Sequence, residues 1–253
     1  MRLEAVKAIV TGAASGLGRH FALQLAAAGA AVAAGDVDTG GLNTMQTESA
    51  KLPGGVLAMK LDVSEETSIV EFVKEASRRL SGVNTLVNNA GILRDGFLTT
   101  QETGWIKKLP TSQWKRVIDV NLTGPYLMAR EVVSDMLLRG TREGVIVNIS
   151  SVARSGNPGQ ANYSASKAGL DAAARSWALE LASSGIRVGC IAPGLVDTPM
   201  LNEIPEGALG ALVAKTPLMR VGTPHEIWLA LKFIIECDFF TGRVIEVDGG
   251  VAF

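Results

Sequence analysis

The 253-residue chain contains few of the residues that build disulfides, metal sites or basic surfaces. It has two cysteines, Cys190 and Cys237, and two histidines, His20 and His225, whose spacing matches no metal-binding motif. Cys190 lies in an apolar run that indicates a buried strand, so we expect no disulfide and a reducing, cytoplasmic location. The net charge of −1 argues against nucleic acid as a partner, and no apolar run has membrane-spanning length.

What the chain has instead is a series of short apolar runs separated by longer amphipathic segments. The runs are continuous rather than alternating, as expected for strands that are buried on both faces of a parallel sheet. This pattern predicts one α/β domain over residues 1–253, with seven parallel strands flanked by helices on both faces. The predicted strands are Ala5–Thr11, Ala30–Asp36, Val56–Asp62, Thr85–Asn89, Gly144–Ser150, Ile186–Ala192 and Arg243–Val247.

Three features predict where helices begin or bend. Ser64 is a predicted N-cap, and Thr223 with Glu226 forms a predicted capping box. A long predicted helix contains Pro125, which has no amide hydrogen to offer the carbonyl group of Asn121. We therefore expect a kink at this point. The kink either frees the carbonyl oxygen to hold a water or is needed only for packing.

Tyr163 and Lys167 form the most informative pair in the chain. They are four residues apart, so on a helix their Cβ atoms lie roughly 5–6 Å from each other on one face. A neighbouring ammonium favours the phenolate and lowers the pKa of a tyrosine. The pair therefore predicts a general acid/base, although a spacing of this kind also arises by chance.

A glycine-rich segment follows the first predicted strand and precedes a helix. Its glycines, Gly12, Gly16 and Gly18, permit a tight turn and a close approach of the backbone to a pyrophosphate. Asp36 ends the second predicted strand, where a carboxylate can accept ribose hydroxyls and repel a 2′-phosphate. The pattern favours NAD(H) over NADP(H); the plainer interpretations are a simple turn and a solvated acid at a strand end.

Taken in chain order from Val6 to Gly250, these motifs resemble the short-chain dehydrogenase/reductase family. The resemblance implies a Rossmann-like, doubly wound fold and a nicotinamide cofactor. Because the segment Arg243–Phe253 resembles one that packs across a subunit contact, it also implies a homotetramer. The residues implied to bind the cofactor are Gly12, Ser15, Gly16, Leu17, Gly18, Asp36, Asp62, Val63, Asn89, Ala90, Gly91, Tyr163, Lys167, Pro193, Gly194, Val196 and Thr198.

The same resemblance implies a catalytic tetrad of Asn121, a serine, Tyr163 and Lys167. Tyr163 would exchange the hydroxyl proton of the substrate, Lys167 would hold the nicotinamide ribose, and Asn121 would hold a water that leads to Lys167. Position on the strand favours Ser151 as the serine, whereas the interval counted back from Tyr163 favours Ser150. We favour Ser151, because loops absorb deletions more easily than strand ends.

The rest of the chain says less about the substrate. Residues 92–98 resemble the 3-oxoacyl-thioester reductases, yet the usual biosynthetic members use NADPH and have an arginine where this chain has Ser15. Residues 99–110 predict an inserted loop or hairpin, and residues 198–220 a substrate lid. Arg154 is expected to be an exposed loop residue. The apolar residues of the predicted lid are Met200, Leu201, Ile204, Leu209, Leu212 and Val213.

These observations predict an oxidoreductase that transfers a hydride between NAD(H) and a small secondary alcohol or ketone, without a metal. One alternative is a reductase of 3-oxoacyl thioesters carried on acyl carrier protein or CoA, or the corresponding 3-hydroxyacyl dehydrogenase. A second is a non-catalytic NAD-binding regulator, against which the complete tetrad argues.

Overall fold

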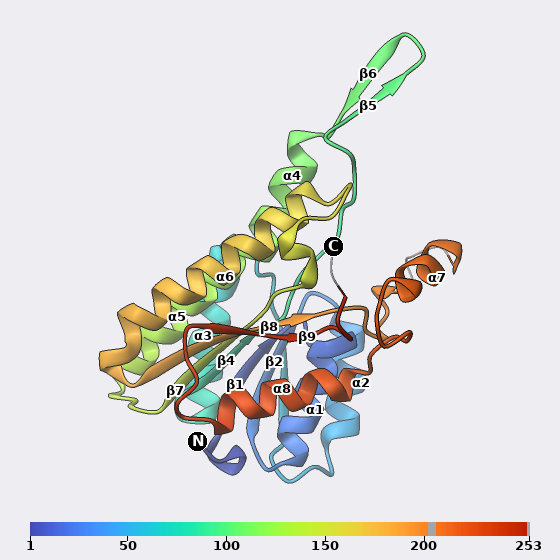
Figure 1. The fold of residues 1–253 in the computed structure, drawn as a ribbon. Helices are drawn as coiled ribbons and strands as arrows, with labels where there is room; N and C mark the ends of the chain where they lie inside the picture. The colour runs from blue at the N-terminus through green and yellow to red at the C-terminus, as the bar shows by residue number, and fades with distance from the viewer. Residues whose placement is uncertain (202–205, 252–253) are drawn as a thin grey trace.

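The computed structural model describes residues 1–201 and 206–251. Its centre is a seven-stranded parallel sheet with strand order β3-β2-β1-β4-β7-β8-β9 (Figure 1). The predicted fold class, a doubly wound sheet of seven parallel strands, is confirmed. The strands are β1 (Lys7–Thr11), β2 (Ala31–Asp36), β3 (Val56–Lys60), β4 (Thr85–Asn88), β7 (Gly144–Ile149), β8 (Ile186–Pro193) and β9 (Arg243–Val247).

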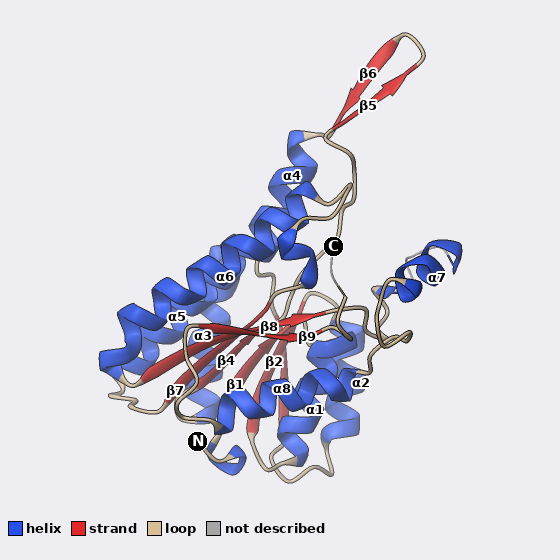
Figure 2. Ribbon diagram, viewed as in Figure 1, coloured by secondary structure: helices blue, strands red, loops and turns tan. Residues whose placement is uncertain are grey.

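Helices cover both faces of this sheet (Figure 2). One face carries α1 (Gly16–Ala27), α2 (Thr39–Ser49) and α8 (Pro224–Glu236), and the other carries α3 (Glu66–Leu80), α5 (Gly124–Leu138) and α6 (Ala161–Leu181). Because both faces are covered, every residue of the interior strand β7 is buried. This explains why the strands are continuous apolar runs in the sequence.

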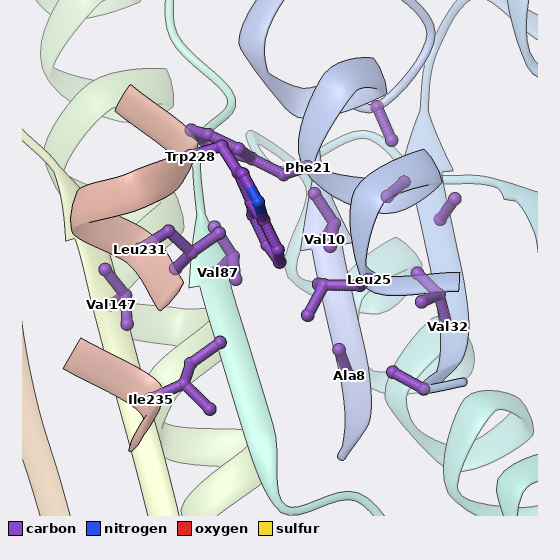
Figure 3. Close-up of a cluster of buried hydrophobic side chains, with 14 of the residues drawn as sticks. Ala8, Val10, Phe21, Leu25, Val32, Val87, Val147, Trp228, Leu231 and Ile235 are labelled. Atoms are coloured by element: carbon purple, nitrogen blue, oxygen red, sulfur yellow. The ribbon is translucent and has the colours of Figure 1, made fainter. Parts of the chain in front are cut away.

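The core on the first face fixes the position of α1. Figure 3 shows the Trp228 side chain extending from α8 toward α1, beside Phe21 of α1 and Val87 of β4. All three side chains are at most 5% exposed. The start of α1, which carries the glycine-rich segment, is therefore held against the ends of β1 and β4.

The order of the strands also determines where a ligand can bind. β1 pairs with β2 on one side and with β4 on the other, so the chain runs outward from the centre in two opposite directions. In open parallel sheets, such a reversal leaves a crevice outside the carboxyl ends of the two central strands. Every predicted site motif lies at the carboxyl end of a strand of this sheet or on a helix beside that edge.

Two predicted boundaries need correction. β1 begins at Lys7 rather than Ala5, because residues 3–5 form a 3-10 turn. Ser64 is not the N-cap of α3, because Glu65 is the residue that precedes the helix; the Ser64 hydroxyl donates to Asp62 Oδ1 at 2.6 Å. The capping box is confirmed: Thr223 accepts from the amide of Glu226, whose carboxylate accepts from the amide of Thr223.

Two elements extend from this body (Figure 1). Residues 99–108 form an antiparallel hairpin of β5 (Thr99–Glu102) and β6 (Trp105–Lys108), which projects beyond α4 (Thr111–Ile118). All eight strand residues are exposed, and a hydrogen bond of 3.1 Å from Leu109 N to Leu98 O closes its base. On another side, α7 (Glu206–Ala214) lies apart from the sheet.

Over residues 1–201 and 206–251, no helix combines the length and apolarity needed to cross a bilayer. In the same part of the chain, no group of three or more histidine, cysteine, aspartate or glutamate side chains converges as a metal site would require.

Candidate active site

A cleft with a volume of about 390 Å³ opens at the carboxyl ends of the central strands. All predicted site residues line it except Gly18 and Asn121, which lie directly behind its wall. The glycine-rich segment, Asp36 and Asp62 belong to one stretch of the lining, and Ser151, Tyr163 and Lys167 to another. The structure thus brings the predicted cofactor and catalytic residues together in one cleft.

Glycines shape the wall of the cleft at the start of α1. Gly12 has a φ of +65°, and an added Cβ would lie 2.8 Å from the Cα atom of Ala90. Gly18 has no room either, because an added Cβ would overlap the carbonyl oxygen of Gly12 and lie 2.5 Å from Asn89 Nδ2. Asn89 in turn donates to the carbonyl oxygens of Thr11 and Gly12 at 3.0 and 3.1 Å. This packing leaves backbone without side chains at the N-terminus of α1, where a dinucleotide pyrophosphate can bind.

Two carboxylates lie farther along the cleft. Asp36 accepts from the amides of Ala14 and Asp38 at 2.9 and 3.0 Å, which fixes its orientation. Asp62 accepts from the amide and the hydroxyl of Ser64, and these bonds hold the pKa of Asp62 below its ordinary value. This end of the cleft therefore suits hydroxyl and amine donors such as those of adenosine.

Asn121 lies in a break of the predicted helix over residues 111–139. The α4 helix passes into a π turn at Asp119–Thr123, and the amide of Gly124 donates to the carbonyl of Asp119. The predicted kink beside Pro125 is confirmed. The buried Asn121 side chain accepts from the amide of Ile92 at 2.9 Å and donates to its carbonyl at 3.0 Å. Asn121 thereby fixes the loop that follows β4, and its role toward a water stays a prediction.

Lys167 lies at the floor of the cleft and is 4% exposed. Its Nζ atom donates to the carbonyl oxygen of Ile149 at 2.7 Å and lies 5.5 Å from the ring centroid of Tyr163. Burial lowers the pKa of Lys167 to about 8, and the charge of Asp171 opposes this shift. The ammonium is fixed in place by one backbone acceptor, which leaves its other two hydrogens for a ligand.

The predicted effect of Lys167 on Tyr163 is wrong in this structure. Burial raises the pKa of Tyr163 above its ordinary value, hydrogen bonding by Ser151 opposes the rise, and the charge of Asp95 adds to it. The lysine does not reverse this, because its Nζ atom is directed at Ile149 rather than at the phenol. At neutral pH the phenol is therefore protonated.

The two candidate serines have different surroundings. Ser151 precedes the 3-10 turn Val152–Ser155, where its Oγ atom accepts from the amide of Ala153 at 3.1 Å, and it lies within reach of Tyr163. Ser150 is 3% exposed, and its hydroxyl is directed at the carbonyl oxygen of Lys167 at 3.4 Å. This difference supports the choice of Ser151, whose hydroxyl shares the open cleft with the phenol.

Arg154 differs from its prediction as an exposed loop residue. Its side chain is 19% exposed, and its Nε atom lies 3.0 Å from a carboxylate oxygen of Asp171 on α6. A second ion pair joins it to Glu246 on β9. Neither partner is close to Arg154 in sequence, so no local pattern could have indicated the contacts.

Several residues that line the cleft were not predicted. Among them, Arg116 of α4 is the most informative, because its charge acts on Asp62 and it lies one helical turn before Val120, another lining residue. Residues four apart share one face of a helix, so this spacing could have indicated that Arg116 lies on the same face as Val120. The others are Val37, Leu61, Ile92, Ile149, Pro199 and, among the residues considered as alternatives, Ser150 and Met200.

The predicted lid is only partly accounted for. Met200 lines the cleft beside Thr198, whereas Leu209, Leu212 and Val213 are half-buried on α7 and do not line it. Ile204 lies outside the described residues.

Similarities to known proteins agree with this site. A family model described as enoyl-(acyl carrier protein) reductase matches residues 12–252. The chain is 40% identical to the 3-oxoacyl-(acyl-carrier-protein) reductase FabG of Thermotoga maritima, over 99% of both chains. It is 36% identical to the (3R)-3-hydroxyacyl-CoA dehydrogenase of Canis lupus familiaris, over 99% of this chain and 98% of that one. A crystal structure of a candidate gluconate dehydrogenase from Agrobacterium tumefaciens matches with a TM-score of 0.89 at 34% identity, covering 98% of this chain and 96% of that chain.

The resemblance drawn from the sequence motifs is thus confirmed. With its parallel sheet, its cleft at the carboxyl edge and these similarities, the chain belongs to the short-chain dehydrogenase/reductase family, oxidoreductases that act on CH–OH or C=O groups with a nicotinamide cofactor.

Proposed function

We propose that this enzyme is an NAD(H)-dependent dehydrogenase that interconverts a secondary alcohol and a ketone, with Tyr163 as general acid and base. The observation that carries the proposal is the meeting of Tyr163, Lys167 and Ser151 in the same cleft as Asp36 and the glycine-rich segment. The bound nicotinamide would supply or accept the hydride. The chain's own residues would hold both reactants and move the proton.

Tyr163 would donate its phenolic proton to the carbonyl oxygen of a ketone as that oxygen becomes an alkoxide. Ser151 would hold the same oxygen by hydrogen bonding, and Lys167 would bind the nicotinamide ribose with the hydrogens that Ile149 does not accept. Because burial keeps the phenol protonated, ketone reduction is favoured at neutral pH. Alcohol oxidation needs the phenolate and should accelerate as the pH rises.

The two tyrosines of the chain provide a matched test. Tyr163→Phe removes the proton donor with little change of shape, so we expect turnover to be lost while NADH binding, followed by fluorescence, persists. Tyr126→Phe is the control, because Tyr126 is exposed on α5 and does not line the cleft. Retained turnover in Tyr163→Phe would refute the proposed role. An inactive wild-type protein that still binds NADH would favour the non-catalytic regulator.

The preference for NAD(H) rests on Asp36. A 2′-phosphate at about 4 Å from this carboxylate would be repelled by roughly 1 to 4 kcal/mol per pair of unit charges. Arg116 is the one arginine among the described residues that line the cleft, and its charge acts on Asp62. We expect a higher kcat/KM with NADH than with NADPH, and a reduced difference in Asp36→Ser. A wild-type preference for NADPH would contradict this assignment.

A second candidate function is the reduction of 3-oxoacyl thioesters or the reverse oxidation of 3-hydroxyacyl thioesters. It is supported by the names of the relatives described above, one acting on an acyl-carrier-protein substrate and one on a CoA substrate. A panel of simple ketones, 3-oxoacyl-CoA and 3-oxoacyl-carrier-protein substrates would separate the two functions. A thioester preference of more than tenfold in kcat/KM would select the second.

We also propose that the enzyme assembles as a homotetramer. The flank formed by α8 and the segment before β9 exposes three large apolar side chains, Leu229, Phe233 and Phe239, of which Phe239 is completely exposed. Burying such a surface against a second copy would remove it from water. Light scattering on a sizing column is expected to give four times the chain mass, and a monomer would contradict the proposal.

A further inference from the structure

Arg154 joins three separate segments of the chain behind the catalytic residues. It lies in the 3-10 turn that follows Ser151. Its Nε atom lies 3.0 Å from Asp171 Oδ2 on α6, and its Nη2 atom contacts Glu246 on β9. One guanidinium thus connects the serine loop, the helix that carries Tyr163 and Lys167, and the last strand of the sheet.

Stability alone gives no reason for this arrangement. Asp171 is 6% exposed, and the desolvation cost of a buried ion pair commonly equals or exceeds what the attraction returns. Asp171 Oδ1 and Arg154 Nη1 are buried without a hydrogen-bond partner in the described part of the chain. Unsatisfied polar atoms of this kind add to the cost, which suggests a role for the cluster beyond packing.

The position of Asp171 suggests what that role is. Asp171 follows Lys167 by one helical turn on α6, so its carboxylate lies on the same side of the helix. The groups around Lys167 that can carry charge are Tyr163 and Asp171 on its own helix and Cys190 on β8. Asp171 is the carboxylate in this group, and it forms an ion pair with Arg154.

We propose that Arg154 is a positioning residue, which is held by Asp171 and Glu246 and ties the Ser151 loop to the helix that presents Tyr163 and Lys167. The inference rests on the proposed function, because it concerns the geometry of that same site. Burial raises the pKa of Asp171, and the hydroxyl of Ser150 and the charge of Arg154 oppose the rise. The guanidinium, 3.0 Å from the carboxylate, therefore favours the ionised form of Asp171, and the carboxylate in turn favours the charged form of Lys167.

Two variants of similar size to the native residues test the two steps, the effect of Arg154 on Asp171 and the effect of Asp171 on Lys167. Asp171→Asn removes the carboxylate, and Arg154→Met removes the cation that keeps the carboxylate ionised. In both variants, we expect the pH at which NADH affinity falls to move down by about one unit, the usual size for losing one neighbouring opposite charge. Arg154→Met should also lower kcat at least about tenfold with little change in the KM for NADH, because the serine loop loses its anchor. Arg154→Lys should restore part of the loss.

Arg187 offers a matched control. Its side chain is 15% exposed, similar to that of Arg154, but it donates to the carbonyl oxygens of Ile234, Ile235 and Phe240 at the far end of α8. Arg187→Met should lower the melting temperature without moving the pH profile. A structural role for Arg154 would produce the same result in both arginine variants, which would overturn the proposal.

The binding measurement needs no turnover, so it separates this proposal from the proposed function. If Tyr163→Phe retained activity, the catalytic assignment would be refuted. The pH profiles of NADH affinity would still decide the role of Arg154. Unchanged affinity profiles in folded Asp171→Asn and Arg154→Met, with Glu246→Gln as a third variant at an exposed partner, would refute the proposal even in an active enzyme.

Discussion

Gly18→Ala tests whether the first turn of α1 is as tightly packed as the structure indicates. The change adds one methyl group at a residue that does not line the cleft. Its Cβ atom would overlap the carbonyl oxygen of Gly12 and lie 2.5 Å from Asn89 Nδ2; the first is a backbone atom, and the second is held by its hydrogen bonds to the carbonyl oxygens of Thr11 and Gly12. The backbone of the glycine-rich segment must therefore move.

The expected magnitude follows from three contributions. Moving the segment weakens the two hydrogen bonds from Asn89 to Thr11 and Gly12, each with a net contribution of about 1 kcal/mol. Overpacking costs typically another 1 to 3 kcal/mol, in order of magnitude. Replacing glycine by alanine within a helix returns about 1 kcal/mol. We therefore expect a net loss of roughly 2 to 4 kcal/mol, or a melting temperature lower by on the order of 10 °C.

Urea unfolding and fluorescence titration with NADH measure the two consequences, stability and cofactor binding. Gly210→Ala on α7 is the control, because no heavy atom lies within 4 Å of the added Cβ. That variant should be stabilised by up to about 1 kcal/mol. If Gly18→Ala were as stable as wild type and bound NADH equally well, the close packing of α1 against the glycine-rich segment would be wrong.

Three further variants probe other parts of the chain. Burial lowers the pKa of Lys167 from 10.5 to about 8, so between these pH values the unfolded chain holds a proton that the folded protein has released. The free energy of unfolding should therefore rise with pH there by up to about 1.4 kcal/mol per unit, and Lys167→Met should remove that rise in urea titrations. Thr223→Ala breaks the capping box of α8 and should cost about 1 kcal/mol by the same method, whereas an unchanged midpoint would mean that the exposed cap adds nothing. Replacing residues 99–108 by two glycines should leave the melting temperature nearly unchanged, because the hairpin is fully exposed and closes between Leu98 and Leu109; a large drop would show that it packs against something.

The fold was predictable because its signals are local and repeated. Strands buried on both faces must be apolar throughout, and for this reason all seven predicted strands begin and end within two residues of the observed bounds, with β9 matching at both ends. The capping box of α8 and the break beside Pro125 were also predictable, since each depends on a backbone hydrogen bond between near neighbours. Ser64 failed as an N-cap because Asp62, two residues away, competes for its hydroxyl.

The proximity of the predicted catalytic residues could be foreseen from the sequence, but their electrostatics could not. The spacing of Tyr163 and Lys167 placed both side chains on one helix face, and the structure agrees. The direction of the Lys167 ammonium depends on Ile149 of β7, whose carbonyl oxygen accepts its hydrogen bond. That contact joins residues 18 positions apart. Arg154 and Glu246 are 92 positions apart, and only the completed sheet brings them together.

Burial acts on Tyr163 and Lys167 in opposite directions on the pKa scale but toward the same result, the neutral form of each side chain. In a site built from these two groups alone, burial would favour loss of the positive charge of Lys167. Asp171 is the residue that resists this loss, because it is a carboxylate on the same helix and its own charge is maintained by Arg154. In the proposed mechanism, the charge of the cation that would hold the ribose is therefore supported by a buried ion pair outside the cleft. We expect substitutions at this pair, rather than at the predicted tetrad, to change the pH range of the enzyme without removing a reacting group.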